Sequence, residues 1–140
     1  MGFTYPSLAW IRELERICNA DPEFKDAVSD FVGKMVLHIE ADEKLGKDVS
    51  LFIDVGDGRI KESAEYASVQ DRPDADYILS AKYAVWKEVI AGRLEPLRAI
   101  MTRKMKLVKG SQMKILKYVK FTLRMMTNAM TVDSTFELEK

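Results

Sequence analysis

A hydrophobic period of two runs through the middle of the sequence and constrains the fold more than any other feature. Apolar and polar residues alternate through residues 35–41, 49–55 and 60–66, as expected for half-buried β-strands. A Gly-Asp-Gly sequence at 56–58 separates the last two segments, and these residue types readily adopt the positive φ angles of a tight hairpin. The alternation therefore predicts strands that follow one another directly and pair antiparallel.

Segments with helical spacing lie on both sides of these strands. Apolar residues recur every three or four positions in 8–18, 22–31, 86–90, 96–101 and 111–127, the pattern of helices with one buried face. Two further short strands are expected at 76–79 and 105–107, and Ser80 is expected to cap the helix around 86–90.

Strands grouped together, with helices before and after them, indicate an α+β fold rather than a βαβ repeat. We predict an approximately five-stranded, mainly antiparallel sheet that is covered on one face by helices. Residues 1–140 are expected to form a single domain, with residues 131–140 as a loosely ordered tail.

The composition agrees with one globular domain. The chain has 140 residues, of which 47% are hydrophobic and 31% charged, and this size usually supports one core. No apolar run reaches the roughly 18 residues of a membrane span. The first residues lack the basic start and apolar run of a signal peptide, so a cytoplasmic protein is expected.

The residues that usually perform chemistry are scarce. His38 is the only histidine and Cys18 the only cysteine, so an internal disulfide and a cysteine-rich zinc site are excluded. No nucleophile, base and oxyanion-binding group assemble in the sequence, and the Gly-Asp-Gly segment lacks the spacing of a phosphate-binding loop. We therefore predict no catalytic residues, no metal site, no cofactor and no enzymatic activity.

Residues 111–127 carry more apolar surface than an ordinary helix. On a helical projection their apolar side chains span roughly 220°, whereas a surface helix needs little more than about 100°. A deeply buried helix, a dimer interface and a ligand cavity would each explain the excess. Six of the eight methionines fall between Met101 and Met130, which mildly favours an adaptable cavity, but composition does not separate the three.

An ordered set of segments resembles the sterol-carrier-protein (type two) lipid-transfer family. The segments are Leu-Phe-Ile-Asp-Val-Gly-Asp-Gly at 51–58, Asp-Ala-Asp-Tyr-Ile-Leu-Ser at 74–80, Trp-Lys-Glu-Val-Ile-Ala-Gly-Arg-Leu-Glu-Pro at 86–96, Ala-Ile-Met at 99–101 and Lys-Met-Lys-Leu at 104–107. The sequence departs from the family pattern at Arg103, where a glycine is expected.

The resemblance implies an apolar tunnel between the sheet and the C-terminal helices. It implies non-catalytic binding and transfer of a fatty acid, acyl-CoA, phospholipid or sterol-like lipid. The alternative is an accessory or dimerisation module associated with an enzyme of lipid metabolism. From periodicity and resemblance together, we expect the tunnel to be lined by Leu51, Ile53, Trp86, Val89, Ile90, Leu97, Ile100, Met101, Met105, Leu107, Ile115, Val119, Leu123 and Met126.

The charges are unevenly distributed along the neutral chain. Residues 96–132 contain nine basic side chains and no acidic one, which creates a local positive field. This segment is expected to touch an anionic membrane surface transiently or to steer a ligand's carboxylate or phosphates; a solvated helix face is the alternative. Nucleic acid is not expected as a partner, because the stacking aromatics and recognition motifs are missing. The sequence leaves open whether the protein forms a homodimer.

Overall fold

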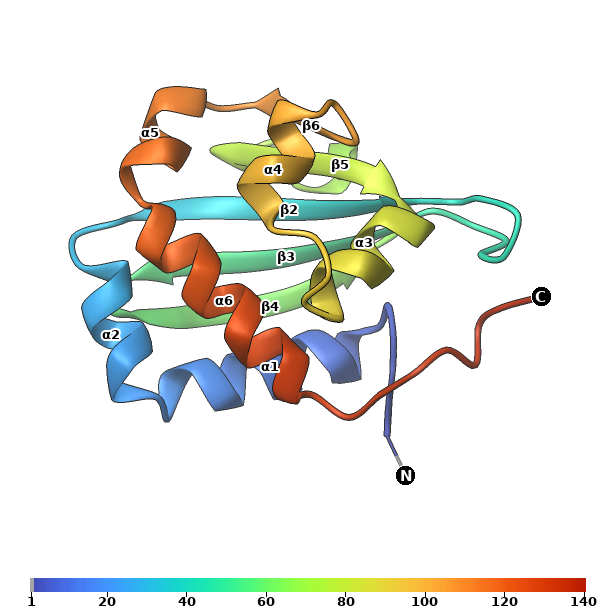
Figure 1. The fold of residues 1–140 in the computed structure, drawn as a ribbon, viewed down its shortest axis with the longest axis horizontal. Helices are drawn as coiled ribbons and strands as arrows, with labels where there is room; N and C mark the ends of the chain where they lie inside the picture. The colour runs from blue at the N-terminus through green and yellow to red at the C-terminus, as the bar shows by residue number, and fades with distance from the viewer. Residues whose placement is uncertain (1) are drawn as a thin grey trace.

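The computed structural model describes residues 2–140, and a five-stranded sheet forms its centre (Figure 1). The strands are β2 (Gly33–Glu40), β3 (Val49–Gly56), β4 (Arg59–Tyr66), β5 (Tyr77–Lys82) and β6 (Met105–Lys109). They lie in the order β4-β3-β2-β5-β6. All neighbours are antiparallel except β2 and β5, which are parallel. The predicted α+β class and mainly antiparallel sheet are confirmed.

The hairpin between β3 and β4 has the expected two-residue turn. Asp57 and Gly58 adopt φ angles of 55° and 75°, and Gly56 pairs with Arg59 across the turn. Two successive positive φ angles match the twist of the adjoining strands. A positive φ, of 64°, also occurs at Arg103. Glycine adopts that conformation most easily, which gives a backbone reason for the glycine expected there from the family pattern.

Helices cover one face of the sheet (Figure 1). They are α1 (Leu8–Asn19), α2 (Pro22–Val28), α3 (Tyr83–Ile90), α4 (Pro96–Met101), α5 (Gln112–Lys117) and α6 (Val119–Thr131). The main hydrophobic core lies between them and the sheet. The opposite face carries a small cluster that includes Val36, Phe52 and Ile78, and the Arg72 guanidinium lies 3.7 Å from the centre of the Phe52 ring. A 3₁₀ turn, Val69–Asp71, adjoins this second cluster.

Two boundaries differ from the predicted ones. Residues 111–127 do not form one helix, because Tyr118 (φ −104°, ψ 40°) separates α5 from α6. Ser80 does not cap a helix: it lies within β5 opposite His38 and donates a hydrogen bond to Glu40 Oε2 at 2.7 Å. Helix α3 begins three residues later, after Lys82, without a side-chain cap.

Residues 132–140 pack against the domain, which differs from the expected loose tail. Strand β7 (Ser134–Thr135) pairs in parallel with β1 (Phe3–Thr4). Phe136 lies against the rings of Tyr5 and Tyr83, and the Tyr83 hydroxyl donates to Glu139 Oε2 at 2.9 Å. These partners are distant in sequence, so local periodicity gives no sign of them.

No helix within the described residues combines the length and the apolar character that crossing a bilayer requires.

A polar junction joins α6 to the turn between α1 and α2. Arg124 donates through Nε and Nη2 to the Asp21 carboxylate at 2.6 and 3.1 Å, and Asn128 Nδ2 donates to the same carboxylate at 3.1 Å. The Arg124 hydrogen bonds are the main reason that the pKa of Asp21 falls to about 2. Cys18 is buried beside this junction, and burial raises its pKa to about 12, so the thiol stays protonated.

The junction makes stability depend on pH at the acidic end. The folded pKa of Asp21 lies below its ordinary value of 3.8, so its contribution is fully present above about pH 4 and is lost as the pH falls toward 2. Asp21→Asn keeps a side chain that can cap α2 but removes the charge. We expect this variant to melt at a lower temperature than the wild type at pH 7, and the gap to narrow toward pH 2.

Glu23→Gln is the matched control, because Glu23 contacts the same arginine through a largely exposed carboxylate. Its melting temperature should stay close to that of the wild type. A gap between wild type and Asp21→Asn that does not change with pH would contradict the assignment of the ion pair.

Candidate ligand-binding site

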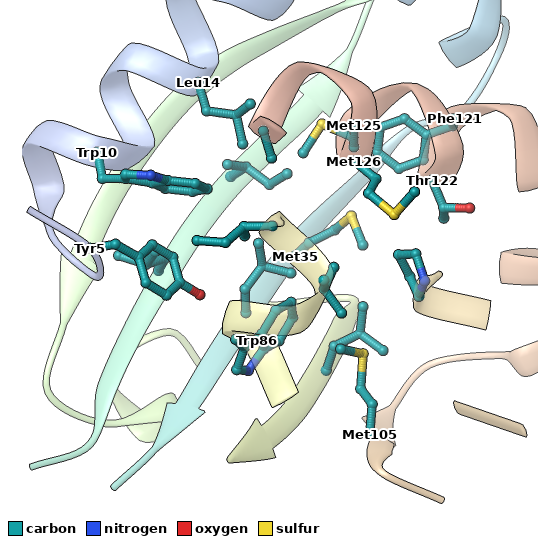
Figure 2. A pocket seen from close by; sticks show the side chains of 18 residues that line it. Tyr5, Trp10, Leu14, Met35, Trp86, Met105, Phe121, Thr122, Met125 and Met126 are labelled. Carbon is teal, nitrogen blue, oxygen red and sulfur yellow. The ribbon is translucent and has the colours of Figure 1, made fainter. Parts of the chain in front are cut away.

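A cavity of about 90 Å³ lies between the helix-covered face of the sheet and the helices (Figure 2). Its walls come from β2, β3, β5 and β6 on one side and mainly from α1, α3 and α6 on the other. The lining residues are Tyr5, Trp10, Leu14, Met35, Leu37, Leu51, Ile53, Leu79, Trp86, Val89, Ile90, Pro96, Met105, Phe121, Thr122, Met125, Met126 and Ala129.

The strand wall follows directly from the hydrophobic period of two. Side chains two positions apart on a strand point to the same face, so Met35 and Leu37 on β2 line the cavity together. Strand register places Ile53 opposite Met35, and Leu51 opposite Leu37. Leu79 on β5 lies beside Leu37 on the other side. Three adjacent strands thus present one continuous apolar surface.

Two tryptophans on the helix side are held by hydrogen bonds. Trp86 Nε1 on α3 donates to the His38 carbonyl oxygen at 2.9 Å, and Trp10 Nε1 on α1 donates to Ser134 Oγ at 2.7 Å. With the indole N–H satisfied, each ring can offer its apolar surface to the cavity. Helix α6 contributes Phe121, Thr122, Met125, Met126 and Ala129, which recur about one helical turn apart.

The cavity is almost free of polar groups. None of the described residues that line it carries a charge. The Thr122 hydroxyl donates to the Val119 carbonyl oxygen within α6, at 2.9 Å. Burial, with a smaller effect from Tyr83, raises the pKa of Tyr5 well above 10, so its hydroxyl is neutral at physiological pH. The site can therefore hold hydrocarbon, but it offers no acid, base or nucleophile.

The size of the cavity limits what fits without rearrangement. An engineered cavity of about 150 Å³ binds benzene, and ligand pockets usually measure about 300–1,000 Å³. A long hydrocarbon chain therefore requires side chains to move. Met35, Met105, Met125 and Met126 line the cavity, and unbranched methionine changes conformation more easily than other core residues.

The only histidine lies on the other face of the sheet. His38 Nδ1 is 2.6 Å from Ser50 Oγ, and Nε2 is 3.2 Å from Asp48 Oδ2. The sequence gives no sign of these two polar partners. Ser50 is nevertheless completely buried within β3, so a substrate cannot reach its hydroxyl as it could in a hydrolase. No group of three or more metal-binding side chains occurs in the described part of the chain.

Some of the predicted site residues line the cavity and others do not. Those that line it are Leu51, Ile53, Trp86, Val89, Ile90, Met105 and Met126. Those placed elsewhere are Leu97, Ile100, Met101, Leu107, Ile115, Val119 and Leu123. The break at Tyr118 explains part of the difference, because Ile115 and Leu123 no longer share one helical face. Met101 is 72% exposed and Leu123 is 36% exposed.

Several further lining residues lie on apolar faces that the sequence pattern already indicates. Met35, Leu37 and Leu79 continue the strand pattern of the residues named, Trp10 and Leu14 lie on the apolar stripe of α1, and Phe121 and Met125 belong to the apolar arc of α6. The sequence pattern does not indicate the remaining four lining residues, because their approach to the cavity depends on tertiary packing alone. These are Tyr5, Pro96, Thr122 and Ala129.

A sequence model of the SCP-2 sterol transfer family matches residues 14–122, a range that includes most of the cavity wall. The chain belongs to this family. The resemblance drawn from the sequence segments is thereby confirmed. No curated protein matches the chain.

Solved structures with this fold agree. The crystal structure of a sterol carrier protein 2 has a TM-score of 0.82 and 27% identity over 90% of this chain and 97% of that one. A conserved hypothetical protein from Thermus thermophilus, described as a candidate sterol carrier protein, has a TM-score of 0.82 and 27% identity. The match covers 96% of this chain and 95% of that one. Sterol carrier protein 2 from Yarrowia lipolytica, at 18% identity, a TM-score of 0.56 and 89% and 92% coverage, supports the fold alone.

Two substitutions on α6 distinguish the cavity wall from the predicted stripe. Phe121→Ala removes a buried ring that also contacts Phe24 and Phe31, so it should lower the free energy of unfolding by about 3–5 kcal/mol. Leu123→Ala alters a partly exposed side chain and should change it by less than about 0.5 kcal/mol. Denaturant titration measures both, and equal losses would place Leu123 in the core.

Proposed function

We propose that this SCP-2 family chain binds the hydrocarbon part of a lipid in the cavity between the sheet and α1, α3 and α6, and transfers it unchanged. The observation that carries the proposal is the wall itself: apolar side chains from four strands and four helices converge on it without a charged group among the described residues. The solved structures with 27% identity are those of sterol carrier proteins or a candidate of that class, which supports a lipid as the ligand.

The affinity of such a site depends mainly on the length of the hydrocarbon. Each methylene moved from water into an apolar cavity contributes about 0.8 kcal/mol, and part of this gain offsets the ordering of ligand and side chains. An apolar wall does not distinguish one chain from another by hydrogen bonds. We therefore infer a broad set of ligands, which includes fatty acids, acyl-CoA, phospholipids and sterol-like lipids.

Transfer without chemistry fits the groups that surround the cavity. The neutral Tyr5 hydroxyl and the Thr122 hydroxyl are its only oxygen-bearing side chains among the described residues, and neither is paired with a base there. An accessory or dimerisation role and a cytoplasmic location stay predictions.

Filling the cavity should weaken binding without unfolding the protein. Ala129→Leu adds three carbons at a lining position on α6, and cavity-filling substitutions commonly maintain or raise stability. We expect wild type to displace a fluorescent fatty acid at micromolar lipid concentration, and the variant to bind at least about tenfold more weakly.

Thr127→Leu is the matched control, because it introduces the same side chain at an exposed position of the same helix. Its affinity should equal that of the wild type. Lipid extraction and native mass spectrometry of the purified protein supply an independent reading. Wild-type protein that carries no lipid and displaces no probe with any lipid class would contradict the proposal.

We further propose that lipid exchange takes place on an anionic membrane at the basic edge, which we define as residues 96–117 of α4, β6 and α5. These three elements lie together along the top of the molecule in Figure 1. Exposed apolar side chains alternate there with cations: Met101, Val108, Met113 and Leu116 with Lys104, Lys106, Lys109, Lys114 and Lys117. No salt bridge to another described residue neutralises these lysines.

The basic edge suits an anionic bilayer because both of its components favour that surface. A lysine near such a membrane contributes about 1 kcal/mol, and exposed apolar side chains can enter the headgroup region. The attraction should weaken with salt, since exposed charges are screened.

Charge reversal tests the basic edge directly. Lys114→Glu with Lys117→Glu should reduce sedimentation with phosphatidylserine-containing vesicles by at least about tenfold, and leave binding of a soluble lipid probe unchanged. The control pair, Lys47→Glu with Lys61→Glu, changes two exposed lysines outside the edge and should have a much smaller effect. Equal losses for both pairs would indicate nonspecific attraction.

A further inference from the structure

The hydrogen-bonding groups that border the cavity are few and almost all occupied by the protein. Tyr5, Trp10, Trp86 and Thr122 are the described lining residues whose side chains carry an N–H or O–H group. Trp10 donates to Ser134, Trp86 to the His38 carbonyl, and Thr122 to the Val119 carbonyl. The Tyr5 hydroxyl is the exception: it lines the cavity and has no side-chain hydrogen bond to another described residue.

The Tyr5 ring is also enclosed and fixed in position, whereas its oxygen is not one of the completely enclosed unpaired atoms of the described residues, which are Ser63 Oγ and Thr135 Oγ1. The side chain is 2% exposed, and its ring packs edge-on against Trp10, with centroids 4.7 Å apart. Tyr83 and Phe136 contact the same ring at centroid distances of 6.3 and 6.5 Å. Figure 2 shows the Tyr5 oxygen directed among the lining side chains, toward Trp86, while Thr122 lies on the opposite side of the group.

A hydroxyl that faces an apolar cavity lowers stability unless a group in the cavity hydrogen-bonds to it, and a phenylalanine would fill the same space without that cost. Ring packing therefore does not explain why the position carries an oxygen. A ligand atom that hydrogen-bonds to the hydroxyl would explain it.

The surroundings restrict the chemistry of that ligand atom. No charged side chain lines the cavity within the described residues, so a carboxylate or phosphate placed beside Tyr5 would be buried without a counter-charge, which is strongly unfavourable. A hydroxyl or carbonyl oxygen carries no such penalty. The phenol can donate to either one and can also accept from a hydroxyl.

We infer that Tyr5 Oη hydrogen-bonds one uncharged oxygen of the lipid, either a hydroxyl or a carbonyl, at the side of the cavity opposite Thr122. This inference rests on the proposed function, since it assumes that hydrocarbon occupies the rest of the cavity. Tyr5 makes the site selective for neutral lipids with an oxygen at one end. Ionised fatty acids have to leave their carboxylate at the solvent side.

The test compares ligands of one chain length that differ in their terminal group: 1-decanol, methyl decanoate, decane and, at pH 8, decanoate. Tyr5→Phe removes the oxygen and keeps the ring. It should weaken binding of 1-decanol, methyl decanoate or both by about 5- to 10-fold, as expected for one lost hydrogen bond. A weaker affinity for 1-decanol identifies a hydroxyl as the group that Tyr5 binds, and a weaker affinity for methyl decanoate identifies a carbonyl. Decane should bind unchanged or more tightly.

Tyr83→Phe is the matched control, because it removes a hydroxyl that is bound to Glu139 and lies outside the cavity wall. It should change the affinities for decanol and decane by the same factor. The tyrosine ¹³Cζ resonance of Tyr5 in the wild-type protein gives a second reading, independent of how the variant folds. It should shift with decanol or the ester and not with decane.

The outcomes separate this inference from the proposed function. A Tyr5→Phe effect of equal size on decane and on both oxygenated ligands overturns the inference, as does no effect on any of them. Tighter binding of ionised decanoate than of decanol, dependent on Tyr5, overturns the restriction to neutral oxygens. Failure of the wild type to bind any of the four ligands contradicts the proposed function itself, whereas binding without a Tyr5 effect contradicts this inference alone.

Discussion

Strand β2 holds the structure together because it is hydrogen-bonded on both sides and faces a different environment on each surface. It pairs antiparallel with β3 and parallel with β5, so the meander and the C-terminal half of the chain meet on it. Met35 and Leu37 on its inner surface line the cavity, and the carbonyl of His38 holds Trp86 of α3. A shift of β2 by one residue would exchange its two surfaces and would remove the cavity wall and the Trp86 anchor together.

The inner surface of the sheet was predictable because the information is local. A period of two in residues 35–41 and 49–55 already states which side chains share a face, and the hairpin residues place those strands next to each other. Leu51 and Ile53, which were predicted as lining residues, accordingly lie on the cavity wall. Met101 and Leu123 were not placed correctly, because a helical period shows that a side is apolar but not which part of it is covered.

The features that were missed depend on contacts between distant residues. The conformation of Tyr118 breaks a helix whose spacing looks continuous, and Ser80 belongs to a strand because β2 and β6 lie on either side of it. Tyr5 precedes the first helix, and its ring reaches the cavity through tertiary contacts with Trp10, Tyr83 and Phe136. The polar partners of His38 likewise come from β3 and the segment before it.

The parallel pairing of β1 with β7 has a consequence for the order in which the cavity forms. Phe3 and Ser134 lie near opposite ends of the sequence, so bringing them together closes nearly the whole chain into one loop, and such long-range contacts form late because their entropic cost comes before their stabilisation. Phe136, which follows β7, completes the aromatic packing around Tyr5. We therefore expect the sheet and its hairpin to assemble first, and the Tyr5 end of the cavity to close last during folding.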